Sequence, residues 1–454
     1  MNRASNFTAR RFQGAILLAA LAMTGGPLPA QSQRKSPVKS PVQSSSSQPK
    51  EDPLAPLLQQ AKDAIDKNDF SAALEPLQKY TAQRPDDPYT HFQLGYAYAG
   101  LKRWDEAKAE FSRAIALDPK MAQAHQNLGL VLMDSNPGEA AEAFRRAADL
   151  QPAESRPRFL AGFALEHAGK FGEAIEQYRA ALGISPKDYE VHFALGRVLL
   201  RTDDAPGAEE HFREAVAVRG DSAPARLGLA NALLAQKKFG AGTDALAEYL
   251  KLNPGDRAED FERASALMEI GRFDDALAEL DRAETGSALT AEGLKMRGDI
   301  YLHQNKWKEA SETLAQAMQQ SPQDRQLLEW LGHVEIELHD YPKAINILAK
   351  VVANSPQDAD PLRDLVNAFF LNGDYAATIG AMDRLAKLET PKPGSWFVRA
   401  ICYDKLSRKP EAIEAYQKFL ELDNGQNDTQ DFQARRRAYT LQSELGQAPK
   451  RQKH

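Results

Sequence analysis

The chain has 454 residues, with 57 Lys and Arg against 63 Asp and Glu, which gives a net charge of −6 at pH 7. This acidic balance argues against general nucleic-acid binding, which depends on a basic surface. The single cysteine, Cys402, excludes a disulfide within the chain, and its neighbours Ile401 and Tyr403 favour a buried structural thiol.

The first 30 residues have the pattern of a secretory signal. Arg3, Arg10 and Arg11 precede a short apolar run from Ala15 to Met23, and the segment 28–30 resembles a small-residue cleavage site. The run is too short for an ordinary membrane-spanning helix, which needs about 20 apolar residues. We therefore expect an exported protein, periplasmic or secreted, with no membrane insertion after cleavage. An uncleaved anchor is the alternative.

Residues 31–53 are rich in Ser, Pro, Gln and Lys, and they include the run from Ser44 to Ser47. A stretch of this composition cannot bury enough apolar surface to offset the entropy of folding. We expect it to be a disordered tether.

From residue 54 onward the chain repeats with a period of 34 residues, shortened once to 33. The first marker of each repeat is a small residue, replaced once by valine: Ala61, Gly95, Gly129, Gly162, Gly196, Ala230, Ala264, Gly298, Gly332, Val366 and Ala400. A second marker, usually alanine, follows twelve residues later, and most repeats end in proline. A fixed period near 34 with these columns indicates stacked helix-turn-helix units, and hence an all-α fold.

The segment from His91 to Pro119 shows the pattern best. Its first half contains Leu94-Gly95 and Tyr98, and its second half contains Ala107 and Phe111. In these columns the chain resembles the tetratricopeptide repeat family. The resemblance implies antiparallel helix pairs stacked into a right-handed superhelical solenoid.

The resemblance covers most of the chain. About eleven units occupy residues 54–426. We expect a C-terminal capping helix over 427–446, because a solenoid needs a terminal element with a polar outer face, and a disordered tail over 447–454.

No motif of an enzyme, cofactor site or metal site is present in the sequence. His333, Glu335, Glu337 and His339 look like a metal cluster, but on a helix a step of two residues turns about 200°, so they do not share a face. The repeats leave no stretch for a separate catalytic domain. We expect a protein that is not an enzyme and has no cofactor and no metal.

The repeat family implies that the first helix of each unit lines a concave face. Three units place aromatic residues, and two of them also arginine, at those positions: Tyr89, Phe92 and Tyr96 in the second, Arg156, Phe159 and Phe163 in the fourth, and Phe193, Arg197 and Arg201 in the fifth. Aromatic residues and arginine dominate binding energy at interfaces. The alternative is that the phenylalanines only pack between units. Because arginine is rarely a core residue, we expect loss of Arg197 to leave stability unchanged.

These features predict a non-catalytic scaffold that binds a protein or peptide segment on its concave face in the cell envelope. An assembly or adaptor role fits this arrangement. The alternative is a carbohydrate-binding solenoid whose aromatic residues stack on sugar rings. The sequence leaves the oligomeric state open.

The signal pattern leads to a first prediction. The mature protein should begin near Gln31, because cleavage after Ala30 removes the apolar run. Intact-mass analysis of the protein from its native host checks this. Recovery of only a full-length cytoplasmic species would contradict it.

Overall fold

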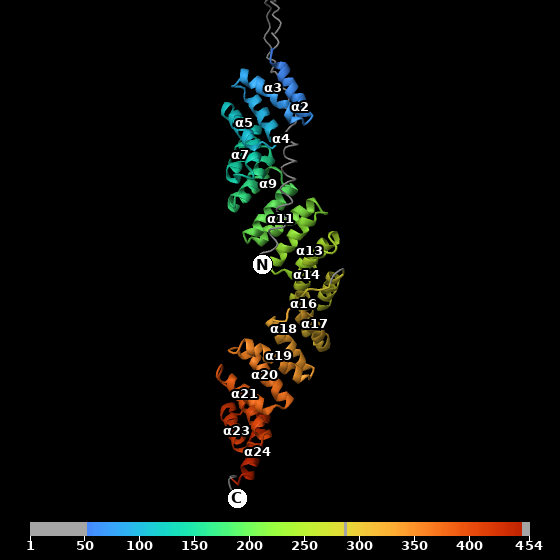
Figure 1. The fold of residues 1–454 in the computed structure, drawn as a ribbon, viewed down its shortest axis with the longest axis vertical. Coiled ribbons are helices and arrows are strands. Elements are labelled where there is room, and N and C mark those ends of the chain that lie inside the picture. The colour runs from blue at the N-terminus through green and yellow to red at the C-terminus, as the bar shows by residue number, and fades with distance from the viewer. Residues whose placement is uncertain (1–51, 286–287, 447–454) are drawn as a thin grey trace, which may run out of the picture. The chain divides into compact units, whose positions relative to one another are not determined.

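The structure, a computed structural model, describes residues 52–285 and 288–446. The predicted signal peptide, nearly all of the predicted tether and the predicted tail therefore lie outside the described residues. Every element of the described residues is an α-helix. The all-α helix-pair solenoid expected from the repeat is thereby confirmed (Figure 1).

The described chain forms two compact units, which divide after Leu252. The first unit contains six helix pairs: α2 (Ala55–Asp66) with α3 (Phe70–Gln83), α4 (Pro88–Gly100) with α5 (Trp104–Leu117), α6 (Ala122–Leu132) with α7 (Pro137–Leu150), α8 (Ser155–His167) with α9 (Phe171–Ile184), α10 (Tyr189–Arg201) with α11 (Ala205–Val218), and α12 (Ala223–Ala235) with α13 (Phe239–Leu252).

The second unit contains five helix pairs and a last helix. They are α14 (Arg257–Glu269) with α15 (Phe273–Glu284), α16 (Ala291–His303) with α17 (Trp307–Gln320), α18 (Arg325–Glu337) with α19 (Tyr341–Asn354), α20 (Ala359–Asn372) with α21 (Tyr375–Leu385), α22 (Pro393–Lys405) with α23 (Lys409–Asp423), and then α24 (Asp428–Glu444).

Local chemistry explains where the helices begin. Asp69, Asp87 and Asp188 stand before α3, α4 and α10, and their carboxylates accept hydrogen bonds from backbone N–H groups of the first turn. Such caps satisfy donors that have no partner inside the helix. At the other end, the proline columns supply residues that cannot continue a helix interior.

A left-handed residue separates the two helices of ten of the eleven pairs. These residues are Asn68, Lys102, Gly169, Asp203, Lys237, Gly271, Asn305, His339, Gly373 and Ser407, with φ between 55° and 81°. The third pair lacks such a residue, because the turn between α6 and α7 is one residue shorter. Asn136 caps α7 there, and Pro137 occupies its first position.

Close helix crossing explains the small-residue column. A Cβ atom added to Gly129 on α6 would lie 2.8 Å from the Phe144 ring on α7. A Cβ added to Gly162 on α8 would lie 2.7 Å from the Tyr178 ring on α9. Phe144 and Tyr178 are themselves fully buried. The glycines therefore let a large side chain of the second helix lie directly on the backbone of the first.

This packing leads to a second prediction. Gly129→Leu should destabilise the first unit by about 1–3 kcal/mol, because the added side chain overlaps Phe144. Chemical denaturation followed by circular dichroism measures the change. Gly183→Leu is the matched control, since Gly183 is exposed on α9 and nothing lies within 4 Å of an added Cβ. It should be neutral or stabilising by up to about 1 kcal/mol. Equal losses in both variants would contradict the close crossing.

Candidate protein-binding surface

The first group of predicted binding residues lies on α4, and Tyr89 is its most accessible member. Tyr89 is 40% exposed and lies at the N-terminal end of α4. Asp87 caps this end through the Tyr89 N–H, so the ring position is tied to a well-defined helix start. Tyr89 is available for contact with a partner.

Tyr89 lines an open hollow between α2 and α4, called here the α2–α4 hollow. Its volume is about 550 Å³, including the solvent-filled mouth. The lining residues are Ala55, Leu58, Gln59, Ala61, Lys62, Ile65, Leu77, Tyr89 and Gln93. Six of these nine are aliphatic or aromatic residues, so the floor is apolar and the polar groups are few. A surface of this kind can take an apolar side chain of a partner.

The other two residues of this group are half-buried and take part in packing. The Phe92 ring centroid lies 5.8 Å from that of Phe111 on α5. The Tyr96 ring meets Phe70 of α3 edge-on, with centroids 5.9 Å apart. Burial raises the pKa of Tyr96 above its usual value. Both rings therefore support the helices beside the hollow, and only part of each remains open to contact.

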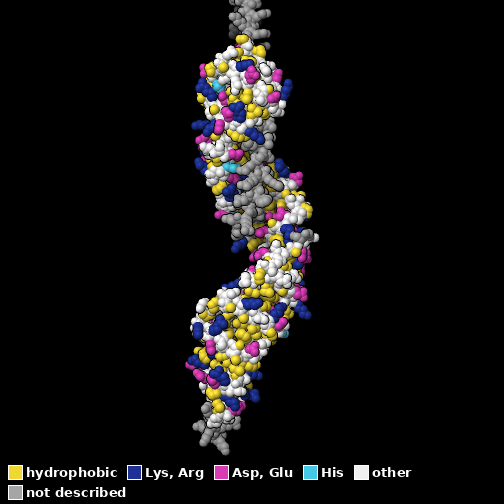
Figure 2. Space-filling view, in the orientation of Figure 1, with side chains coloured by type: hydrophobic (Ala, Val, Ile, Leu, Met, Phe, Trp, Pro, Cys, Tyr) yellow, Lys and Arg dark blue, Asp and Glu magenta, His cyan; other side chains and the backbone are white. Residues whose placement is uncertain are grey.

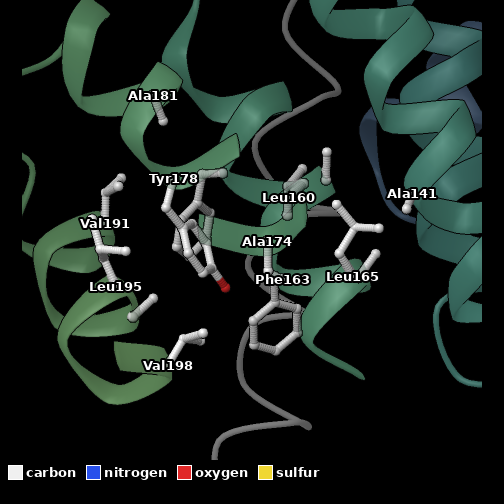
Figure 3. Close-up of a cluster of buried hydrophobic side chains, with 14 of the residues drawn as sticks. Ala141, Leu160, Phe163, Leu165, Ala174, Tyr178, Ala181, Val191, Leu195 and Val198 are labelled. Atoms are coloured by element: carbon white, nitrogen blue, oxygen red, sulfur yellow. The ribbon is translucent and has the colours of Figure 1, made fainter. Parts of the chain in front are cut away.

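The aromatic residues on α8 are core residues. Phe159 and Phe163 are 5% and 8% exposed. The Phe159 ring lies 5.8 Å from Tyr178 and 6.3 Å from Phe163, measured between centroids. Figure 3 shows Phe163 beside Tyr178 and among apolar side chains of α8, α9 and α10. Packing between helices accounts for their positions. Whether any part of them also contacts a partner stays a prediction.

The three predicted arginines pair with carboxylates of neighbouring repeats. Arg156 Nη1 lies 2.6 Å from Glu190 Oε2. Arg197 Nη2 donates to Glu166 Oε2 at 2.8 Å, and Arg201 Nη1 lies 3.7 Å from Glu166 Oε1. These pairs connect α8 to α10, so the arginines already have partners within the chain.

Glu166 is the centre of this charged cluster. Its side chain is only 5% exposed, and the Tyr178 hydroxyl also donates to it at 3.2 Å. Burial and the charge of Glu166 raise the pKa of Tyr178 well above its usual value, so the hydroxyl remains a donor. The guanidinium of Arg201 lies 4.5 Å from the Phe171 ring centroid. The cluster binds adjacent repeats to each other.

The predicted residues thus fall into separate groups. Tyr89, Phe92 and Tyr96 share α4, whereas the others form the Glu166 cluster and the rings around it. Phe193 belongs to the second group: it is half-buried, with its ring 6.0 Å from Tyr189 and 5.9 Å from Phe212. No described contact connects the two groups.

Two features were missed from the sequence. Leu58 and Ile65 of α2 line the hollow. They were not predicted because the binding residues were selected as aromatic residues and arginines, and these two are aliphatic. The internal role of Glu166 was also missed. A carboxylate on one first helix, followed 31 residues later by an arginine on the next first helix, is the spacing that could have revealed it.

Grouped metal ligands, the cysteine and long apolar helices are the next features of the described residues. Among them no three His, Cys, Asp or Glu side chains are grouped so as to hold a metal ion. Cys402 is buried as expected, and burial raises the pKa of its thiol to about 11. No helix in 52–285 or 288–446 combines the length and apolar character needed to cross a bilayer. Figure 2 shows basic and acidic side chains interspersed over the visible face.

Comparison with known families identifies the repeat. Family models for the tetratricopeptide repeat match residues 58–122, 92–153, 193–257, 261–325 and 301–369, and another TPR repeat model matches 167–203. The chain belongs to the tetratricopeptide repeat family. A model for subunit 3 of the anaphase-promoting complex, cyclosome, also matches residues 337–419. This membership supports a protein-interaction scaffold.

Solved structures that match part of the chain include three proteins. MamA from Desulfovibrio magneticus RS-1 is 23% identical over 37% of this chain and 96% of its own, with a TM-score of 0.35. YrrB, described as a TPR protein with an unusual peptide-binding site, is 17% identical over 41% and 97%, with a TM-score of 0.38. A chain of Naa15/Naa10 bound to HypK-THB is 15% identical over 79% and 62%, with a TM-score of 0.45. No curated protein matches the chain.

The Glu166 cluster leads to a third prediction and revises the expectation that loss of Arg197 leaves stability unchanged. Arg197→Ala should destabilise the first unit by about 1–3 kcal/mol, because it leaves a buried carboxylate with weaker compensation. Denaturation curves measure this loss. Adding Glu166→Gln to the same variant should recover part of it, since the buried charge with weaker compensation is then removed.

Arg103→Ala is the control for this prediction. Arg103 pairs with Glu106 on the surface, where both side chains are exposed, and such pairs contribute about 0–1 kcal/mol. If Arg197→Ala and Arg103→Ala have equally small effects, the Glu166 cluster does not stabilise the repeats.

Proposed function

We propose that this chain is an exported, non-catalytic scaffold that captures an apolar segment of a partner protein in the α2–α4 hollow. The observation that carries the proposal is the hollow itself, with the exposed Tyr89 ring over a floor that includes Leu58 and Ile65. Helical or extended segments bind such grooves through apolar anchors at regular spacing. Export rests on the signal pattern of residues 1–30.

The charges around the hollow refine the proposal. Arg156, Arg197 and Arg201 have carboxylate partners within the chain, so capture of an acidic peptide by these arginines would require breaking internal pairs. Lys62 lines the α2–α4 hollow and takes part in no described ion pair. The hollow therefore favours a mainly apolar segment with at most a modest acidic contribution.

The carbohydrate alternative depends on exposed aromatic faces. Sugar stacking needs an open ring, and among the nine predicted residues Tyr89 is the aromatic one with the greatest exposure, whereas Phe159 and Phe163 are buried. A single open ring beside Gln59 and Gln93 could contact one sugar. Phe159 and Phe163 therefore present no open ring for the sugar stacking of this alternative.

The fourth prediction tests the hollow. A photo-crosslinking residue at Gln93 should label a bound partner segment, and the labelled peptide is then identified and synthesised. Tyr89→Ala should weaken its binding by about 2 kcal/mol or more, roughly thirty-fold in Kd, while leaving the fold intact. Isothermal titration calorimetry with the synthetic peptide measures this change.

Trp104→Ala is a matched control, because Trp104 is also an exposed aromatic residue of the second repeat, at 38%, but begins α5. Its loss should leave peptide affinity unchanged. Equal weakening by both variants would place the contact elsewhere. Labelling of glycan instead of peptide would favour the carbohydrate alternative.

A further inference from the structure

A histidine recurs near the start of the first helix in three repeats of the first unit. In each case its Nε2 atom lies against the carbonyl oxygen of the preceding repeat's closing proline. The pairs are His91 with Pro85 at 2.9 Å, His125 with Pro119 at 3.1 Å, and His192 with Pro186 at 2.9 Å. A carbonyl oxygen only accepts hydrogen bonds, so Nε2 donates to it in each case. In His192 a neutral ring then leaves a lone pair on Nδ1.

The position opposite Nδ1 differs among these repeats. In the second repeat, Nδ1 of His91 lies 2.6 Å from Glu110 Oε2, a histidine–carboxylate pair. In the third repeat, whose turn is one residue shorter, Ala143 stands in the same register as Glu110. In the fifth repeat the register holds His211. Nδ1 of His192 lies 3.1 Å from Nδ1 of His211, with the rings inclined by 38°.

As the two rings lie, His211 Nδ1–H can donate to the lone pair of His192 Nδ1, and a divalent metal ion can replace this shared proton and bind both nitrogens. Zinc binds histidine nitrogen at about 2.0–2.1 Å with tetrahedral angles, so two such ligands lie roughly 3.3 Å apart. The observed 3.1 Å is a few tenths of an ångström shorter, which small side-chain rotations can supply. His192 is also anchored: metal-bound histidines almost always donate their other ring N–H to a carbonyl or carboxylate, as His192 does to Pro186.

We propose that His192 and His211 bind a divalent transition-metal ion, with Zn²⁺ as the representative case, through their Nδ1 atoms. The ion would connect α10 to α11 within the fifth repeat. Because no third protein ligand is grouped with them among the described residues, water fills the other positions and the ion remains exchangeable. Burial lowers the pKa of His211, and the neighbouring His192 lowers it further, which favours the neutral ring that binds a metal ion.

The surroundings favour an ordered site. His192 is 6% exposed and His211 is half-buried, so solvent reaches the pair mainly through His211. The two histidines belong to helices whose crossing is already set by Gly196 against Phe212. Metal binding therefore needs no rearrangement of the backbone, and its free energy adds to folding stability by linkage.

The fifth prediction tests the pair with the full chain, freed of metal by a chelator and titrated with ZnCl₂ in a calorimeter. The native chain should bind Zn²⁺ and melt at a higher temperature in its presence. His211→Gln keeps a polar partner for His192 but removes a metal ligand, and it should lower Zn²⁺ affinity at least tenfold. His125→Gln should leave affinity unchanged, since His125 has the same carbonyl bond without a second histidine.

A variant that creates a second histidine pair tests the proposal even if His211→Gln folds poorly. Glu110→His places a second histidine opposite His91 in the same register and should add one Zn²⁺ per chain. Circular dichroism verifies that each variant is folded. Equal Zn²⁺ affinity in the native chain and His211→Gln overturns the proposal, as does a native chain that binds no Zn²⁺.

Discussion

The close crossing of two helices within each repeat is the constraint on which the rest of the structure depends. A small residue of the first helix lies under a large side chain of the second, as Gly129 lies under Phe144 and Gly332 under Leu348. Alanine takes the small position in other repeats, as with Ala61, which shares a buried cluster with Leu77, and Ala400, which shares one with Tyr416. The position on the first helix stays small because a close-packed interior tolerates neither overlap nor void.

This constraint leaves other positions free to differ between repeats. The third pair lacks the left-handed turn residue of the other ten, yet α6 and α7 still cross through Gly129 and Phe144. The contacts of the helix faces also vary. Glu166 of the fourth repeat forms an ion pair with Arg197 of the fifth. A histidine faces Glu110 in the second repeat and His211 in the fifth. A common scaffold can thus carry unit-specific contacts without altering the stack.

Whether a predicted binding residue packs inside the chain or stays exposed decides whether it can contact a partner. Most of the predicted binding residues support the repeats: Phe159 and Phe163 are buried, and Arg197 compensates the buried Glu166. Tyr89 differs, because it is exposed beside an apolar hollow with no described side chain covering it. Residue type alone could not separate these cases, since aromatic residues and arginine serve both cores and interfaces.

The sequence by itself determined the helix pairs, their number and the residues at their crossings. The 34-residue period sets the length of each helix pair, and the small-residue column marks where its two helices cross. Only the tertiary structure decided which side chains are free, because that depends on neighbours one repeat away. Arg197 looked available in sequence but reaches Glu166, 31 residues earlier; His192 and His211 looked unremarkable but meet across two helices. The Arg197–Glu166 contact arises from the stacking of two repeats, and the His192–His211 contact arises from the pairing of two helices in one repeat. Neither contact exists within a single helix.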